Sequence, residues 1–150
     1  PWWPLRFAHD APARLRRLDN AAPAQHGYAM DTIYIRDLRV RCIIGIRPEE
    51  RHTPQEVVIN LTLGADLRRA GGSDDLKDTV DYQAVKQAVL AHVSASACQL
   101  VERLAQEVAD ICLGFRGVRT VTVTIDKPGA LRGARSVAVE FTRTRRRGRG

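Results

Sequence analysis

The stretch TIYIRDLRVRCI, residues 32–43, alternates apolar and polar side chains and therefore predicts a β-strand. Ile33 and Ile35 follow one phase of this alternation, whereas Leu38 and the apolar residues after it follow the other. A change of phase within one strand is typical of a β-bulge, because one inserted residue moves the following side chains to the opposite face. We therefore expect a long strand with a bulge near Asp37.

A second strand is predicted after a short loop, so that the two strands form an antiparallel hairpin. Residues 55–66 place every second side chain from Val57 to Leu63 on one apolar face. The loop between the strands contains a Pro-Glu-Glu segment at 48–50, for which we expect one helical turn.

Two helices are expected after the hairpin. Residues 67–79 contain adjacent glycines and predict an irregular connection, whereas residues 82–93 repeat apolar side chains with helical spacing. Ser96 and Gln99 have the spacing of a capping box, so we expect the second helix to begin there. Its predicted apolar positions are Leu100, Leu104, Val108 and Ile111.

Two further strands complete the pattern. Residues 118–127 and 134–143 alternate apolar and polar side chains, and a Pro-Gly turn joins them. The order β-β-α-α-β-β predicts an α+β fold in which one four-stranded antiparallel sheet carries both helices on one face. Such a sheet has two long edges, which proteins normally cover or pair, so we expect several subunits to close a shared barrel.

The net charge of +7 comes from the two ends of the chain. Residues 1–29 hold four arginines and two aspartates, residues 143–150 hold five arginines, and residues 30–142 are neutral with 15 basic and 15 acidic side chains. We expect a folded domain at 30–142, a disordered or non-native extension before it and a basic disordered tail after it. A non-catalytic module that binds polyanions through this tail is an alternative. However, no aromatic residues interleave with its arginines to stack on bases, so nucleic acid is not the expected partner.

Composition also bears on the location of the protein and on whether it uses a metal or a membrane. Cys42, Cys98 and Cys112 are odd in number and lie in apolar segments, which predicts reduced thiols in a cytoplasmic protein. The four histidines are scattered without ligand spacing, so we expect no metal site. No apolar run approaches the roughly 18 residues that cross a membrane, so we expect no membrane partner.

Four stretches resemble the dihydroneopterin aldolase family, which includes dihydroneopterin triphosphate 2'-epimerase. They are IYIRDLRVRCIIGIRPEER, QEVVINLTLGADLRRAGGSDDLKDTVDY, QLVERLAQEVADICL and IDKPGALRGARSVAVEF, and they cover nearly all of residues 31–142. The resemblance implies the tunnelling fold (T-fold), in which four subunits form a barrel and two barrels stack into an octamer. It therefore implies a homo-oligomer, tetramer or octamer, with its active site at the subunit interface.

The activity that the resemblance implies is a retro-aldol cleavage of 7,8-dihydroneopterin into 6-hydroxymethyl-7,8-dihydropterin and glycolaldehyde, on the route to folate. Aldol cleavage needs an electron sink, which many enzymes supply as a lysine Schiff base or a Lewis-acidic metal. The dihydropterin has a C=N bond next to its side chain and is its own sink. We therefore expect a pterin substrate and neither metal nor cofactor, only groups that bind the ring and move protons.

The resemblance assigns ring binding to Glu102, whose carboxylate offers two acceptors to the ring N–H groups, and a backbone contact to Val101. It assigns the catalytic acid/base role to Lys127. The chain uses arginine 21 times and lysine only three times, and a guanidinium cannot readily release a proton. From the pattern alone, an ordinary exposed helix glutamate and a solvated lysine at a strand end are the alternatives.

The resemblance also implies four further contacts with the substrate. Tyr82 would reach the site of a neighbouring subunit and help to protonate the intermediate, while Thr79 and Val80 would line the pterin slot through backbone groups. Glu50 would contact the substrate side chain, although the adjacent Glu49 could take its place in the alignment.

The chain departs from the family pattern at two places. Many members have His-Gly where this chain has Ile44 and Gly45, and Pro-Gly-His where it has Pro-Gly-Ala. The triphosphate epimerase, which inverts the 2' carbon, is therefore an alternative that could use the same Lys127 and Tyr82. Its charged substrate would need cations, for which the candidates are Arg47, Arg132 and Arg135.

Overall fold

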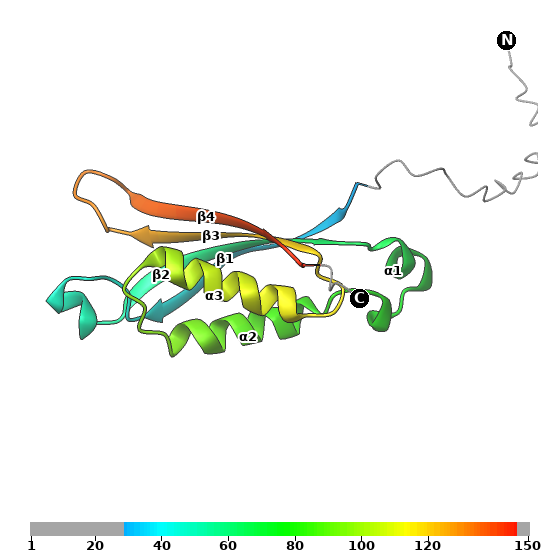
Figure 1. Ribbon diagram of the computed structural model, residues 1–150, viewed down its shortest axis with the longest axis horizontal. Coiled ribbons are helices and arrows are strands. Elements are labelled where there is room, and N and C mark those ends of the chain that lie inside the picture. Colours follow the sequence, from blue (N-terminus) through cyan, green and yellow to red (C-terminus); the bar gives the residue numbers. More distant parts are fainter. Residues whose placement is uncertain (1–28, 147–150) are drawn as a thin grey trace, which may run out of the picture.

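The computed structural model describes residues 29–146, which form one antiparallel sheet with helices on one face (Figure 1). The expected extension at residues 1–29, except residue 29 itself, and residues 147–150 lie outside this description. The strands are β1 (Asp31–Cys42), β2 (Gln55–Ala65), β3 (Thr120–Pro128) and β4 (Ser136–Thr144), and the long helices are α2 (Tyr82–Ser94) and α3 (Val101–Gly114). The predicted α+β fold and order of strands and long helices are confirmed.

The hairpin of β1 and β2 contains the bulge that the change of phase predicts. The register shifts between Ile35 and Leu38, and Asp37 has a positive φ of 54°. The Asp37 N–H donates a hydrogen bond to Asn60 Oδ1 at 2.9 Å, so β2 holds the bulge in place. Ile35 and Leu38 consequently both pack against the core, although an odd number of positions separates them.

The core lies between the sheet and the two long helices. Val121, Val123 and Ile125 of β3 are fully buried, and so are Leu104 and Val108 of α3. Each such side chain contributes about 1.5–3 kcal/mol when it leaves water. This packing fixes the start of α3 relative to the end of β3, which is where the candidate site lies.

The connection from β2 to α2 is more regular than predicted for residues 67–79. It contains the short helix α1 (Arg68–Ser73) and the 3-10 turn η2 (Leu76–Asp78). Asp66 accepts a hydrogen bond from the Arg68 N–H, and Asp74 ends α1 in a left-handed conformation. These local bonds stabilise the helix although its two glycines each cost about 1 kcal/mol relative to alanine, so the irregular prediction was wrong.

The second long helix begins at Val101, later than the predicted capping box at Ser96. The Ser96 hydroxyl instead contacts Cys98 Sγ at 3.1 Å and accepts the Cys98 N–H at 3.4 Å, so it is used within its own turn. Leu100 precedes α3 as its N-cap residue and is 54% exposed, which corrects its assignment to the core. The buried residues of α3 are Leu104, Ala105, Val108, Ala109 and Cys112.

Three smaller features complete the fold. The helical turn expected in the first loop is confirmed as η1 (Pro48–Arg51). β4 extends to Thr144, into the segment expected to be a tail, because its last two residues pair with the start of β3. Within the described chain β1 and β4 are the edges of the sheet, so closure of a barrel by several subunits stays a prediction. No helix among residues 29–146 is long and apolar enough to cross a bilayer.

Candidate active site

One pocket of about 360 Å³ lies where the end of β3, the loop between β1 and β2, and the start of α3 meet. The loop is held to the other two elements by hydrogen bonds, so the pocket is a continuous part of the domain. Four of the predicted site residues line this pocket: Glu50, Val101, Glu102 and Lys127.

Lys127 is the one charged residue among residues 29–146 that is buried as a whole, with 7% of its surface exposed. It follows the buried residues of β3 in the alternating pattern, so its side chain lies on the helix-covered face. Its Nζ donates to Glu50 Oε1 at 2.7 Å and to the Ile44 carbonyl at 3.2 Å. An ammonium has three N–H donors, and the described residues occupy two of them, which leaves one for a ligand.

Glu50 is held in the pocket from two sides. Its Oε1 accepts the Lys127 ammonium, and its Oε2 accepts the Arg47 N–H at 3.0 Å. The bond from Lys127, followed by that from Arg47, lowers the pKa of the Glu50 carboxyl to about 2, so it is ionised at neutral pH. Glu49 is exposed and does not line the pocket, which favours Glu50 over its neighbour as the site glutamate.

Gly45 brings the loop backbone close to this carboxylate. Its φ of +132° is accessible mainly to glycine, and a Cβ at this position would lie 2.1 Å from Glu50 Oε2. A side chain here would therefore displace Glu50 from Lys127.

Glu102 is exposed in the first turn of α3, where the helix dipole favours a negative charge. The other glutamate of this helix, Glu107, binds His92 and Arg103, and Asp110 accepts a hydrogen bond from Gln106. Glu102 differs from them, because no residue in the 29–146 range pairs with its carboxylate. A carboxylate that lines a pocket without a partner is available to bind a ligand with two adjacent N–H donors.

Exposed apolar side chains form walls of the same pocket. Ile46, Leu100 and Leu131 are 70%, 54% and 57% exposed, and all three line it. Clustered exposed apolar groups mark binding surfaces, and here they can cover a flat ring whose polar edge faces Glu102. The sequence did not predict these walls. Ile46 and Leu131 lie in loops without a periodic pattern, and Leu100 matches the apolar helical spacing, so it was predicted to lie in the core.

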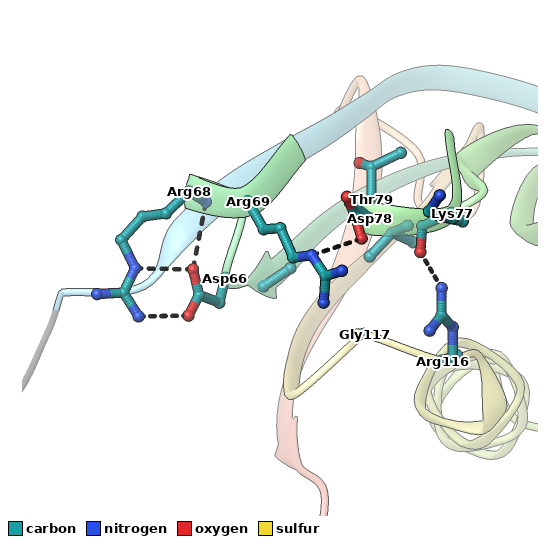
Figure 2. Close-up of a pocket in the computed structure, with 10 residues that line it drawn as sticks. Asp66, Arg68, Arg69, Lys77, Asp78, Thr79, Arg116 and Gly117 are labelled. Atoms are coloured by element: carbon teal, nitrogen blue, oxygen red, sulfur yellow. Dashed lines mark hydrogen bonds and ion pairs between the residues drawn. The ribbon is translucent and has the colours of Figure 1, made fainter. Parts of the chain in front are cut away.

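The remaining predicted site residues lie elsewhere in the chain. Tyr82 is 55% exposed and lines a separate hollow together with Leu76. Thr79 and Val80 line a hollow of about 650 Å³ near α1, part of which Figure 2 shows. Within one chain these three residues do not line the pocket of Lys127. Among residues 29–146 there is no group of three or more His, Cys, Asp or Glu side chains that could hold a metal, and the expectation of no metal and no cofactor stays a prediction.

The model of the dihydroneopterin aldolase family matches residues 33–142. The chain belongs to this family. Folic acid synthesis protein FOL1 of Dictyostelium discoideum is 39% identical over 116 residues, which are 77% of this chain and only 18% of that protein. The dihydroneopterin triphosphate 2'-epimerase of Pseudomonas aeruginosa is 37% identical over 110 residues, 73% of this chain and 89% of the relative.

A solved structure confirms the architecture of the aldolase family for this chain. The crystal structure of Escherichia coli dihydroneopterin aldolase in complex with neopterin has a TM-score of 0.73 and 35% sequence identity, covering 76% of this chain and 99% of the other. The predicted family, the T-fold subunit and the aldolase–epimerase class of enzyme are therefore confirmed. The roles of single residues and the state of assembly stay predictions.

Proposed function

We propose that the chain is an aldehyde-lyase that cleaves 7,8-dihydroneopterin into 6-hydroxymethyl-7,8-dihydropterin and glycolaldehyde, in folate biosynthesis. The observation that carries this proposal is the combination in one pocket of the Lys127–Glu50 pair, the unpaired Glu102 and apolar walls. The walls suit a flat heterocycle, the free carboxylate suits its N–H edge, and the shielded ammonium suits proton transfer at the side chain.

The proposed reaction needs one proton to leave and another to return. The proton of the 2'-hydroxyl is removed, and the C1'–C2' bond breaks to release glycolaldehyde. The electron pair of the broken bond moves into the neighbouring C=N bond of the ring. A proton then adds to C1' to give the hydroxymethyl product. Lys127 is the proposed acid/base group, with Glu50 orienting its ammonium and contacting the hydroxyl groups of the substrate, while Glu102 and the Val101 backbone hold the ring.

The proposed active site is completed by a second subunit. Tyr82 and Leu76 are exposed side by side on the surface, and β1 and β4 are sheet edges that another chain could extend. We propose a homo-tetramer or octamer in which the neighbouring subunit supplies Tyr82 to protonate the intermediate, and Thr79 and Val80 to line the pterin slot. The three cysteines are free, which is compatible with the proposed cytoplasmic location.

The triphosphate 2'-epimerase activity is the second candidate, because a relative of that name matches the chain at 37% identity. In this reaction the aldehyde would add back to the opposite face of the same intermediate. Arg47 lines the pocket and is exposed, so it could meet a phosphate, whereas Arg132 and Arg135 are exposed and do not line the pocket.

Product analysis separates the two activities. The purified chain is incubated with 7,8-dihydroneopterin and, separately, with its triphosphate, and the products are resolved by chromatography. Release of glycolaldehyde from the first substrate is the expected result. Epimerised triphosphate without cleavage of either substrate would favour the second candidate, and no conversion of either would contradict both.

A further inference from the structure

We propose that Arg51 is a positioning residue, which ties the Lys127–Glu50 pair to the start of α3 and so sets the place of the acid/base group relative to the ring-binding carboxylate. The inference rests on the proposed function, since it concerns the same pocket. Arg51 follows Glu50 directly at the end of η1 and is half-buried.

The Arg51 guanidinium donates to three main-chain carbonyls on two separate segments. Its Nη1 binds the Gly45 carbonyl at 2.9 Å and the Cys98 carbonyl at 3.0 Å, and its Nη2 binds the Ala97 carbonyl at 2.5 Å. Gly45 belongs to the loop that carries Glu50, whereas Ala97 and Cys98 belong to the segment that leads into α3. One side chain therefore bridges the two walls of the pocket.

The same loop is also held from the side of β3. The Ile44 carbonyl accepts Lys127 Nζ at 3.2 Å and Gln55 Nε2 at 2.6 Å. The direct main-chain link between loop and helix segment is a single long bond, from the Gly45 N–H to the Cys98 carbonyl at 3.4 Å. Arg51 thus supplies most of the polar contact that joins the Lys127 side of the pocket to the Glu102 side.

A guanidinium is suited to this position because its rigid planar fork can meet carbonyls on both segments at once. The ammonium of a lysine is a single point on a flexible stem and cannot reproduce that geometry. If the link is lost, Lys127 and Glu102 can shift relative to each other, and a misplacement of about 1 Å can lower a rate about 100-fold. Binding of the ring itself depends on Glu102 and the walls, so it should change little.

The experiment compares Arg51→Met and Arg51→Lys with Arg145→Met. Arg145 is a matched control, because it donates to the carbonyls of Leu113 and Phe115 at the other end of α3 and does not line the pocket. For each variant we measure kcat and KM for dihydroneopterin, the Kd of neopterin by titration, and the melting temperature.

We expect Arg51→Met to lower kcat about 10- to 100-fold while the Kd of neopterin stays within about threefold. The kcat of Arg51→Lys should lie between those of Arg51→Met and the wild type. Arg145→Met should keep kcat within about twofold of the wild type, even if its melting temperature falls as much as that of Arg51→Met. An unchanged kcat in Arg51→Met, or an equal loss of kcat in Arg145→Met, would overturn the proposal.

Hydrogen exchange tests the link without any turnover. The Gly45 amide should exchange faster in Arg51→Met than in the wild type, and Arg145→Met should leave it unchanged. If the wild type converts no dihydroneopterin, the proposed function fails, and this exchange measurement still decides the link: an unchanged Gly45 rate in Arg51→Met would refute it.

Discussion

The two ends of the sheet each hold a hollow with paired charges, and they differ in what surrounds those charges. At the end of β3, the Lys127 and Glu50 side chains are 8% and 19% exposed and lie between apolar walls. At the α1 end, Figure 2 shows Arg68 bound to Asp66 and Arg69 bound to Asp78. The Asp78 side chain is 7% exposed, but its partner Arg69 is 79% exposed, and Arg68 and Asp66 are 63% and 30% exposed. The α1 hollow is the larger one, about 650 Å³ against 360 Å³, and more charged residues line it, so neither size nor number of charges distinguishes the proposed site.

A shifted pKa does not separate the two ends either. Lys127 lowers the pKa of Glu50 to about 2, and Arg68 lowers the pKa of Asp66 to the same value. Water screens the exposed Arg68–Asp66 pair, whereas the shielded Lys127–Glu50 pair keeps a stronger local field, and Lys127 has one N–H donor without a partner among the described residues. The comparison teaches that the proposed site is distinguished by an ion pair shielded on both partners together with an unused donor or acceptor, as on Lys127 and Glu102.

The largest expected effect comes from removing the shielded ammonium. Lys127→Met should lower kcat about 10²- to 10⁴-fold, because general acid–base catalysis contributes rate factors of this size. Neopterin should still bind, which a titration would check. Lys77→Met is the matched control at the α1 end, where Lys77 pairs with Asp75 and is 70% exposed. An equal loss of kcat in both variants would remove the distinction between the two ends.

The next effect concerns binding. Glu102→Ala should raise the Kd of neopterin at least about tenfold, because charge-assisted hydrogen bonds contribute about 1.5–3 kcal/mol each. Asp110→Ala on the same helix is the control, since Asp110 already binds Gln106 and lies outside the pocket. Calorimetric titration measures the Kd of neopterin for both variants. A wild-type Kd in Glu102→Ala would contradict the role of Glu102 as the ring anchor.

A smaller effect concerns acid stability. The pKa of Glu50 in the folded chain lies below its ordinary value of 4.5, so the carboxylate stabilises the fold above that pH. This contribution is lost as the pH falls towards about 2. Glu50→Gln should therefore weaken the fall in the free energy of unfolding between pH 4.5 and about 2, as measured by urea unfolding at several pH values. Glu49→Gln, an exposed neighbour, should leave the wild-type slope intact.

The smallest effect is expected at the α1 end. Asp66→Asn removes the carboxylate that binds Arg68, and neither residue is proposed to contact the substrate, although Thr79 and Val80 of the proposed pterin slot line the same hollow. We expect kcat to stay within about twofold of the wild type in a steady-state assay. A drop as large as that of the Lys127 variant would show that the Arg68–Asp66 pair itself takes part in the reaction.

Hydrophobic periodicity was sufficient to predict the strands, the long helices and the bulge, because these elements depend on which face of the chain is buried. It missed α1, which depends on a local bond from the Arg68 N–H to the Asp66 side chain and on the left-handed backbone of Asp74, and it placed the start of α3 too early. The rarity of lysine drew attention to Lys127, and family resemblance singled out Glu102. Arg51 left no signal, because all three of its partners are backbone carbonyls, whose position depends on tertiary structure.

The close approach at Gly45 has a practical consequence for changing which heterocycle the enzyme accepts. Combinatorial libraries should leave this glycine unaltered, since any replacement would collide with the Glu50 carboxylate. Diversity belongs instead at Ile46 and Leu131, which line the pocket but are 70% and 57% exposed, so bulkier or smaller groups there should not disturb the interior.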